Sequence, residues 1–348
     1  MAVFAATRVL IMFALSFVVA LFITPLVFRL LDRFNLRKNN IRDKESAPVF
    51  YVYHKDKANT PTMGGIIIWA TVIGLAIIFL VLGGLFDGFA SYLNFVNRSE
   101  TYLPLAALLL AAIVGLVDDM MGIRGKGPHG GGLRMKYKIL LYTAVALIGA
   151  WWFYFRLGWN TLYVPFVGTF DIGGWYIPFF LFVLVASAFS ANETDGLDGL
   201  AGGILLLSFG ALTVVSFVLH RYDLAVMEAA ILGSLLAFLW FNIHPARFFM
   251  GDTGSMSLGI TLGIIAMLTN TALFLPFFAF VLVLESTSVI IQVMGKKFLK
   301  RKLFHSTPIH HHFQALGWPE SQITMRFWII GALMTVFGLV LFFLAHFA

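Results

Sequence analysis

Five aspartates in short motifs are the residues of this sequence best suited to chemistry. They lie in GLVDDM, NETDGLDGLAGG and FFMGDTGS, as Asp118, Asp119, Asp195, Asp198 and Asp252. Asp and Glu together number only 17 among 348 residues, so this grouping is informative. Carboxylates of this kind hold Mg²⁺, which in turn draws polyanionic phosphates toward them. The pattern therefore indicates phosphoryl transfer.

Each aspartate taken singly has a second interpretation, because carboxylates near helix ends also serve as N-caps or as solvated loop charges. Glu285, within the apolar run VLVLESTSVI, has two open roles as well. An ionisable residue at membrane depth is a functional candidate. Glu285 is predicted either to pack a bent helix or to shape the site.

Three consecutive histidines, His310–His312, follow Pro308 and Ile309. Alone, they are typical of a loose metal binder or of a polar loop without function. The sequence has no cysteine and its other candidate ligands are oxygens, which argues against zinc. Beside phosphates, imidazole can donate hydrogen bonds or carry a proton. The isolated histidines are predicted to be incidental: His54, His129, His220, His244 and His305.

The elements that must position these groups are membrane helices. With 60% hydrophobic and 12% charged residues, the composition excludes a soluble globular protein. Apolar runs near the ~20 residues that cross a bilayer recur, and helices satisfy their own backbone groups in lipid. We predict an all-α integral membrane protein with about ten transmembrane helices, residues 1–348 forming one polytopic domain. The expected spans are 8–31, 63–86, 102–117, 137–157, 175–191, 200–219, 225–241, 256–269, 273–295 and 323–346, the eighth being short.

Positive charge assigns the loops to sides. Lys and Arg gather in alternate loops, within 33–57, 124–138 and 296–302 and at Arg247, and such loops are typically cytoplasmic. Both termini are then periplasmic, and every motif above lies at the cytoplasmic face, where one active site can include them all. Because basic residues follow the first span and it lacks a small-residue cleavage site, we expect a retained helix.

Two basic, glycine-containing stretches, HKDKANTPTMGG and GIRGKGPHGGGLRMKYK, are candidates to face phosphate. Neither matches a P-loop or a dinucleotide fingerprint, so a nucleotide would bind in another mode.

Taken together, the motifs resemble those of the polyprenyl-phosphate N-acetylhexosamine-1-phosphate transferase family. The matching pieces run in order from Thr60 to Glu320: TPTMGG, GLVDD, NETDGLDGLA, FNIHPARFFMGDTGS, ESTSVIIQV and PIHHHFQALGWPE. Each is weak alone, whereas their order and spacing are specific. The triple histidine, with the Gly317-Trp318 stretch after it, points to the muramoyl-pentapeptide branch.

The resemblance implies a Mg²⁺-dependent, multi-pass enzyme of the bacterial inner (cytoplasmic) membrane. It would transfer phospho-MurNAc-pentapeptide from UDP-MurNAc-pentapeptide to undecaprenyl phosphate, giving lipid I and UMP, the first membrane step of peptidoglycan synthesis. The resemblance implies an enzyme embedded in the lipid bilayer, with no nucleic acid as a partner. Family members are often dimers, so whether this protein forms a homodimer is an open question.

The alternatives are a UDP-N-acetylglucosamine:undecaprenyl-phosphate sugar-1-phosphate transferase and, from another class, a membrane transporter or flippase. A transporter would place polar residues near the bilayer midplane rather than at helix ends.

The resemblance also assigns roles. Asp118 and Asp119 would lie by the lipid phosphate, with Asp118 as general base, and Asp252 would bind Mg²⁺. Of the three consecutive histidines, His311 is the one most expected to contact the pyrophosphate or take part in the reaction. Asn192, Asp195 and Asp198 of NETDGLDGLA would line the nucleotide site, and this stretch is called the nucleotide motif below. Lys57 would meet phosphate, and the other substrate-binding residues would be Lys138, His310 and His312.

Two positions depart from the family pattern. Gly122 stands where a lysine is common, so that phosphate contact falls to Lys126 or is missing, while Lys138 matches a later family lysine. Glu193 replaces a usually apolar residue and adds negative charge beside the nucleotide motif.

Two routes remain open. Either the lipid phosphate attacks the β-phosphorus directly and UMP leaves, or an aspartate first forms a covalent phospho-sugar intermediate. The direct route is favoured, because it does not require a carboxylate to attack a crowded anion.

Overall fold

The computed structural model describes residues 2–37, 57, 60–96, 99–125 and 132–347. Its helices are α1 (Ala2–Arg33), α3 (Ile66–Leu85), α4 (Phe89–Leu93), α5 (Ser99–Ile123), α6 (Met135–Trp151), α7 (Tyr176–Thr194), α8 (Leu200–Val218), α9 (Tyr222–Asn242), α10 (Asp252–Leu268), α11 (Leu275–Phe278), α12 (Phe280–Phe298), α13 (Ile309–Ala315) and α14 (Glu320–Phe347). A π-helical turn (Trp152–Arg156) extends α6, and two 3-10 turns cover Gly173–Trp175 and Ala272–Phe274.

The structure confirms an all-α membrane protein. Within the described residues, eight helices are long and apolar enough to cross a membrane, and a ninth span is broken, with Ala272–Phe278 and Phe280–Phe298 meeting at 91°. The predicted eighth span is the 17-residue α10, and all of its residues are buried. At ~1.5 Å per residue, α10 is about 26 Å long, slightly less than the hydrocarbon core.

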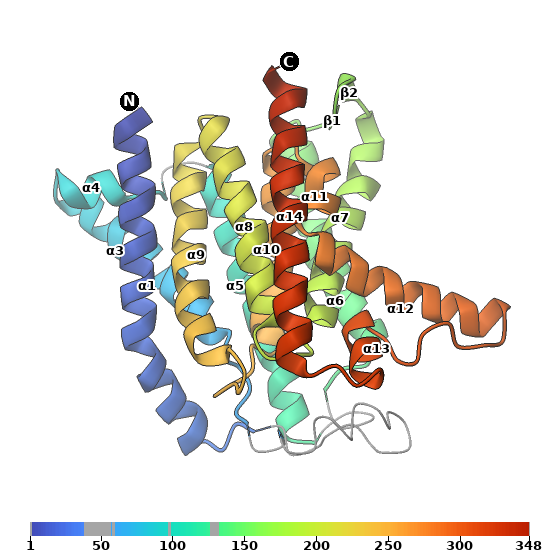
Figure 1. Cartoon of the computed structure of the whole chain (residues 1–348). Helices are drawn as coiled ribbons and strands as arrows, with labels where there is room; N and C mark the ends of the chain where they lie inside the picture. Colours follow the sequence, from blue (N-terminus) through green and yellow to red (C-terminus); the bar gives the residue numbers. More distant parts are fainter. Residues whose placement is uncertain (1, 38–56, 58–59, 97–98, 126–131, 348) are drawn as a thin grey trace.

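The antiparallel order of the helices puts the two chain ends together. Figure 1 shows the N- and C-termini at one end of the bundle, whereas α13 and the start of α14 lie at the other. A small hairpin, which the apolar pattern did not predict, lies near the termini; β1 (Thr161–Val164) pairs antiparallel with β2 (Gly168–Asp171). After its bend, α12 leaves the bundle sideways (Figure 1).

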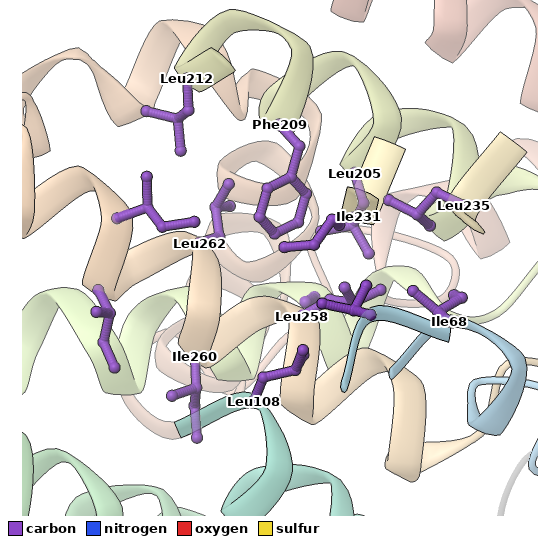
Figure 2. Close-up of a cluster of buried hydrophobic side chains, with 14 of the residues drawn as sticks. Ile68, Leu108, Leu205, Phe209, Leu212, Ile231, Leu235, Leu258, Ile260 and Leu262 are labelled. Atoms are coloured by element: carbon purple, nitrogen blue, oxygen red, sulfur yellow. The ribbon is translucent and has the colours of Figure 1, made fainter. Parts of the chain in front are cut away.

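The central helix α10 packs through a combination of large apolar side chains and glycines. Leu258, Ile260 and Leu262 of α10 belong to a buried cluster to which α3, α5, α8 and α9 also contribute (Figure 2). Because lipid supplies little drive for apolar helices to associate, small residues that allow close backbone contact matter more. A Cβ at Gly115 of α5 would overlap the backbone of Asp252, so this glycine fixes how closely α5 approaches the start of α10.

The close contact gives a stability prediction. Gly115→Val should destabilise the protein by about 1–3 kcal/mol, the usual cost of overpacking, and should move Asp252 away from its neighbours. Gly210→Val on α8 is the matched control, because a Cβ there meets nothing within 4 Å. Thermal unfolding midpoints in detergent measure the difference. Equal midpoints for the two variants would contradict the proposed packing role of Gly115.

Candidate active site

One lysine lies between two carboxylates at the end of the bundle opposite the termini. Lys138, on the first turn of α6, has its Nζ 2.8 Å from Oδ2 of Asp118, near the end of α5. The same ammonium pairs with Oδ2 of Asp252, the first residue of α10. All three side chains are largely buried, at 14% exposure or less. The arrangement satisfies two buried negative charges with one positive charge.

Further hydrogen bonds orient both carboxylates. Asn192 donates from Nδ2 to Oδ1 of Asp252 over 2.7 Å, and the backbone N–H of Leu133 donates to Oδ1 of Asp118 over 2.5 Å. Asp252 also lies at the N-terminus of α10, where the helix dipole favours negative charge. Each carboxylate is therefore held from two sides.

Asp119 points elsewhere, because neighbouring residues on a helix face different directions. Its Oδ2 accepts the backbone N–H of Thr253 over 3.0 Å, and its side chain is fully buried. This is a capping contact, which ties the end of α5 to the start of α10. The predicted contact of Asp119 with a lipid phosphate stays a prediction.

Asp195 connects the NETDGLDGLA loop to the same helix start. Its Oδ2 accepts the backbone N–H of Gly251 over 3.1 Å. Gly251 has φ +73°, a conformation that favours glycine, and a Cβ there would contact Oδ2 of Asp119. The turn before Asp252 thus depends on this glycine and on carboxylates from two other segments.

A second charged cluster surrounds Lys57. Its Nζ lies 2.7 Å from Oδ1 of Asp198 and 2.6 Å from Oε1 of Glu320, and it also lies over the ring of Phe249 at 5.7 Å. The other Asp198 oxygen is 2.9 Å from Nδ1 of His244. Burial raises the pKa of Asp198, but the Lys57 ammonium and the hydrogen bonds that the carboxylate accepts outweigh burial, so the pKa falls below its ordinary value.

Two groups of side chains offer donor atoms to a metal ion. Asp198, His244 and Glu320 have donor atoms within 4.8 Å of one another. His244 adds a nitrogen donor, which Mg²⁺ does not favour, and Lys57 pairs with both carboxylates, so we interpret this cluster as an ion-pair network. Asp118 and Asp252 offer only oxygens, together with the nearby amide of Asn192, and Mg²⁺ favours such ligands. Lys138 pairs with both of these carboxylates, as Lys57 does with the first two, so the lysines do not separate the two groups. The all-oxygen donor set is what fits Mg²⁺ here.

The three consecutive histidines have different surroundings. His310 is fully buried on α13, and Nδ1 of its ring is 3.0 Å from Oε2 of Glu285, which is also fully buried. His311 is buried too, with Nδ1 2.7 Å from Oε1 of Gln314. His312 is partly exposed and its ring stacks on that of His305. Partial burial and the neighbouring His305 lower the pKa of His312.

The Glu285–His310 pair reaches the nucleotide motif. Glu285 also accepts the backbone N–H of His310. If the ring donates from Nδ1 to Glu285, the opposite nitrogen Nε2 faces the NETDGLDGLA loop, where a Cβ at Gly196 would overlap it. Of the two roles left open for Glu285, the geometry favours shaping the site.

The structure brings most predicted residues into connected clusters but departs from the sequence in some places. His244 was expected to be incidental, yet it contacts Asp198, one of the predicted site residues. His305 was also expected to be incidental, yet it stacks on His312. Glu320 and Phe249 were not singled out, although both lie inside quoted motifs, GWPE and FFMGD, whose polar and aromatic residues were the available signal.

The two positions that depart from the family pattern both lie near helix ends. Gly122 lies in the last turn of α5, and Lys126, its suggested substitute, lies outside the described residues. Glu193 is partly buried next to Asn192 on α7. Lys138 is the described lysine that contacts Asp118.

Comparisons with known proteins identify the family of this chain. The glycosyl transferase family 4 profile matches residues 101–270, and a phospho-N-acetylmuramoyl-pentapeptide-transferase signature matches residues 57–68. Curated relatives with that transferase name include one from Desulforamulus reducens, 38% identical over 93% of each chain. Another, from Chloroflexus aurantiacus, is 34% identical over 95% of this chain and 89% of the relative. This protein therefore belongs to the phospho-N-acetylmuramoyl-pentapeptide-transferase family.

Proposed function

We propose that this protein transfers phospho-MurNAc-pentapeptide from UDP-MurNAc-pentapeptide to undecaprenyl phosphate, releasing UMP and forming lipid I in peptidoglycan synthesis. The curated relatives carry the corresponding transferase name. The observation that carries the proposal at the site is the Asp118–Lys138–Asp252 cluster, a charged and oxygen-rich centre at one end of a membrane bundle. Such a centre suits a reaction between phosphate groups.

The orientation is part of the proposal. The charge bias of the loops supports a cytoplasmic position for the carboxylate end, with both termini periplasmic and residues 1–348 as one domain in the bacterial inner membrane. Both termini lie at the same end in Figure 1, which fits an even number of crossings, ten if α10 and the broken helix are counted. A cytoplasmic site would meet a soluble nucleotide donor at the membrane surface.

Mg²⁺ would be held by Asp252, with Asp118 and Asn192 beside it. When bound, the ion would neutralise the negative charge that develops on the pyrophosphate. Lys138 would then shift toward incoming phosphate oxygens, because its ammonium is the cation that both carboxylates share in the structure. Asp118 keeps a fixed direction through the Leu133 N–H, as a base acting on the lipid phosphate requires.

We place the nucleotide at the Lys57 cluster. Lys57 offers a cationic donor, Asp198 an acceptor and Phe249 an aromatic face, all in contact. These groups suit the polar edge and the flat face of a nucleotide base. They suit a phosphate less well, because the charge of Lys57 is already balanced by two carboxylates. Asp195 would support the same loop through Gly251.

The histidines would lie toward the pyrophosphate and sugar. His310 is held by Glu285 and faces Gly196, whereas His311 is held by Gln314. The contacts of His312 with His305 suggest a smaller role for it than for the two buried rings.

The main test is release of UMP by the purified protein with undecaprenyl phosphate and each UDP-sugar, with and without Mg²⁺. We expect UMP only with the muramoyl-pentapeptide donor, and loss of release when the metal is chelated. Release with UDP-N-acetylglucosamine instead would favour the alternative transferase. No release with any donor would contradict the proposal and leave the transporter alternative.

Asp252→Asn sharpens the metal assignment. The substitution preserves the shape of the side chain but removes one negative charge. We expect kcat to fall by about 10²–10³-fold, and the Mg²⁺ concentration that gives half-maximal activity to rise. Asp223→Asn is a control of the same chemistry near the termini, where Asp223 pairs with Arg8. An unchanged Mg²⁺ requirement in Asp252→Asn would exclude Asp252 as the ligand.

Isotope exchange distinguishes the two routes. We expect no exchange of labelled UMP into the UDP-sugar donor when undecaprenyl phosphate is absent, because direct attack requires the acceptor. Rapid lipid-free exchange would show a covalent intermediate and would replace the direct route.

The Glu285–His310 pair gives a further prediction. Glu285→Gln keeps the size of the side chain but replaces its carboxyl group with an amide, so it should orient the His310 ring less well and lower kcat by about 10- to 100-fold, as loss of other orienting partners does. His310→Ala should lower kcat more than His312→Ala. Unfolding midpoints are measured in parallel. If Glu285→Gln retains full kcat, Glu285 serves only to pack the bent helix.

A further inference from the structure

A cleft at the carboxylate end of the bundle lies outside the site described above. It has a volume of about 160 Å³ and opens between α1 and the segment that joins α9 to α10. Its walls are Thr24, Pro25, Phe28 and Arg29 on α1, with Phe241, Arg247 and Phe248 opposite. The contacts that hold the Lys138 cluster come from α5, α6, α7 and α10. The Lys57 cluster takes His244 and Phe249 from the same segment as the cleft, but Arg247 and Phe248, which line the cleft, are not among its contacts.

Two guanidinium groups lie at this cleft, one on each side. Arg29 projects from the last turns of α1, and Arg247 is fixed by its backbone N–H, which donates to the carbonyl of Phe241 over 2.9 Å. The Arg247 guanidinium also lies over the Phe241 ring at 5.8 Å. Within the part of the chain that the structure describes, the ion pairs do not include either arginine. Both are exposed, and a guanidinium group can bind an anion through its planar set of N–H donors.

The floor of the cleft is rigid and apolar. Phe248 is buried, and its ring packs against Phe238 at 5.5 Å and Phe241 at 6.1 Å. A floor of packed rings below two cations suits a ligand that has both an anionic and an apolar part. A small hydrated anion would use only the arginines.

Exposed apolar side chains continue along α1 from Arg29 toward the middle of the helix. Phe22 and Leu26 lie one turn apart on α1, 78% and 58% exposed, and Leu26 is about one turn from Arg29. On a membrane helix such exposed apolar residues face acyl chains, while arginines near the helix end reach the headgroup level. One molecule could therefore place its chains along Phe22 and Leu26 and its phosphate between the arginines.

We propose that this cleft binds the phosphodiester headgroup of an anionic membrane lipid. Basic pockets between transmembrane helices are suited to such headgroups, and paired arginines match phosphate oxygens in charge and in geometry. The lipid is neither donor nor acceptor of the reaction, because the acceptor phosphate is placed beside Asp118.

The test measures binding, not catalysis, so its outcome is independent of the proposed transferase function. The full chain is placed in phosphatidylcholine nanodiscs, and binding of phosphatidylglycerol labelled in its acyl chain is titrated. Arg29→Gln/Arg247→Gln should raise Kd by about tenfold or more. Arg124→Gln/Arg301→Gln removes the same charge from other basic loops and should change Kd by less than about twofold. Equal effects of the two double variants, or no effect of either, would show diffuse attraction and overturn the site.

Two further arms exclude misfolding and a free-phosphate site. Arg29→Lys/Arg247→Lys keeps both charges but loses the planar fork, so its Kd should lie between those of the parent and the glutamine variant. Inorganic phosphate should fail to displace the labelled lipid at concentrations where short-chain phosphatidylglycerol succeeds. Equal displacement by the two would identify a free-phosphate site and contradict the lipid proposal.

Discussion

The ion pairs of Lys138 with Asp118 and Asp252 are the interaction on which the reactive end of this bundle depends. Three helices meet there, and each contributes a charge that would be costly to bury alone. Removing one partner of a buried pair typically costs about 3–5 kcal/mol, because the other charge is left without compensation. The same charges that make α5, α6 and α10 converge are those that a phosphate-handling site requires, so stability and chemistry share these residues.

The central position of α10 follows from small residues as much as from charge. Glycines let neighbouring helices approach its backbone, and Gly251 permits the turn that places Asp252 at a helix N-terminus. Asp119 and Asp195 then hold that turn through backbone N–H groups. Of the five aspartates in the motifs, these two therefore have an evident structural task, whereas Asp118, Asp198 and Asp252 face lysines.

Much of the fold was predictable, because the need to satisfy backbone hydrogen bonds in lipid leaves little choice besides helices for long apolar runs. The short α10 and the broken α11–α12 span were harder to interpret, since burial within the bundle and a sharp bend depend on neighbouring helices. The site aspartates could be predicted from the sequence, because acidic residues are rare in this chain and these five are grouped in short motifs. The role of His244 was missed, because one histidine carries no pattern until Asp198 lies beside it.

The sequence by itself determined an all-α membrane protein, the family, and the residue types of a phosphate-handling site, because composition and ordered motifs need no coordinates. Only the tertiary structure decided which charges are partners: Lys138 with Asp118 and Asp252, Lys57 with Asp198 and Glu320, and Glu285 with His310. These pairs join residues far apart in the chain, and Coulomb attraction and hydrogen bonding depend on distance in space. The packing of the helices sets that distance, and no local pattern encodes it.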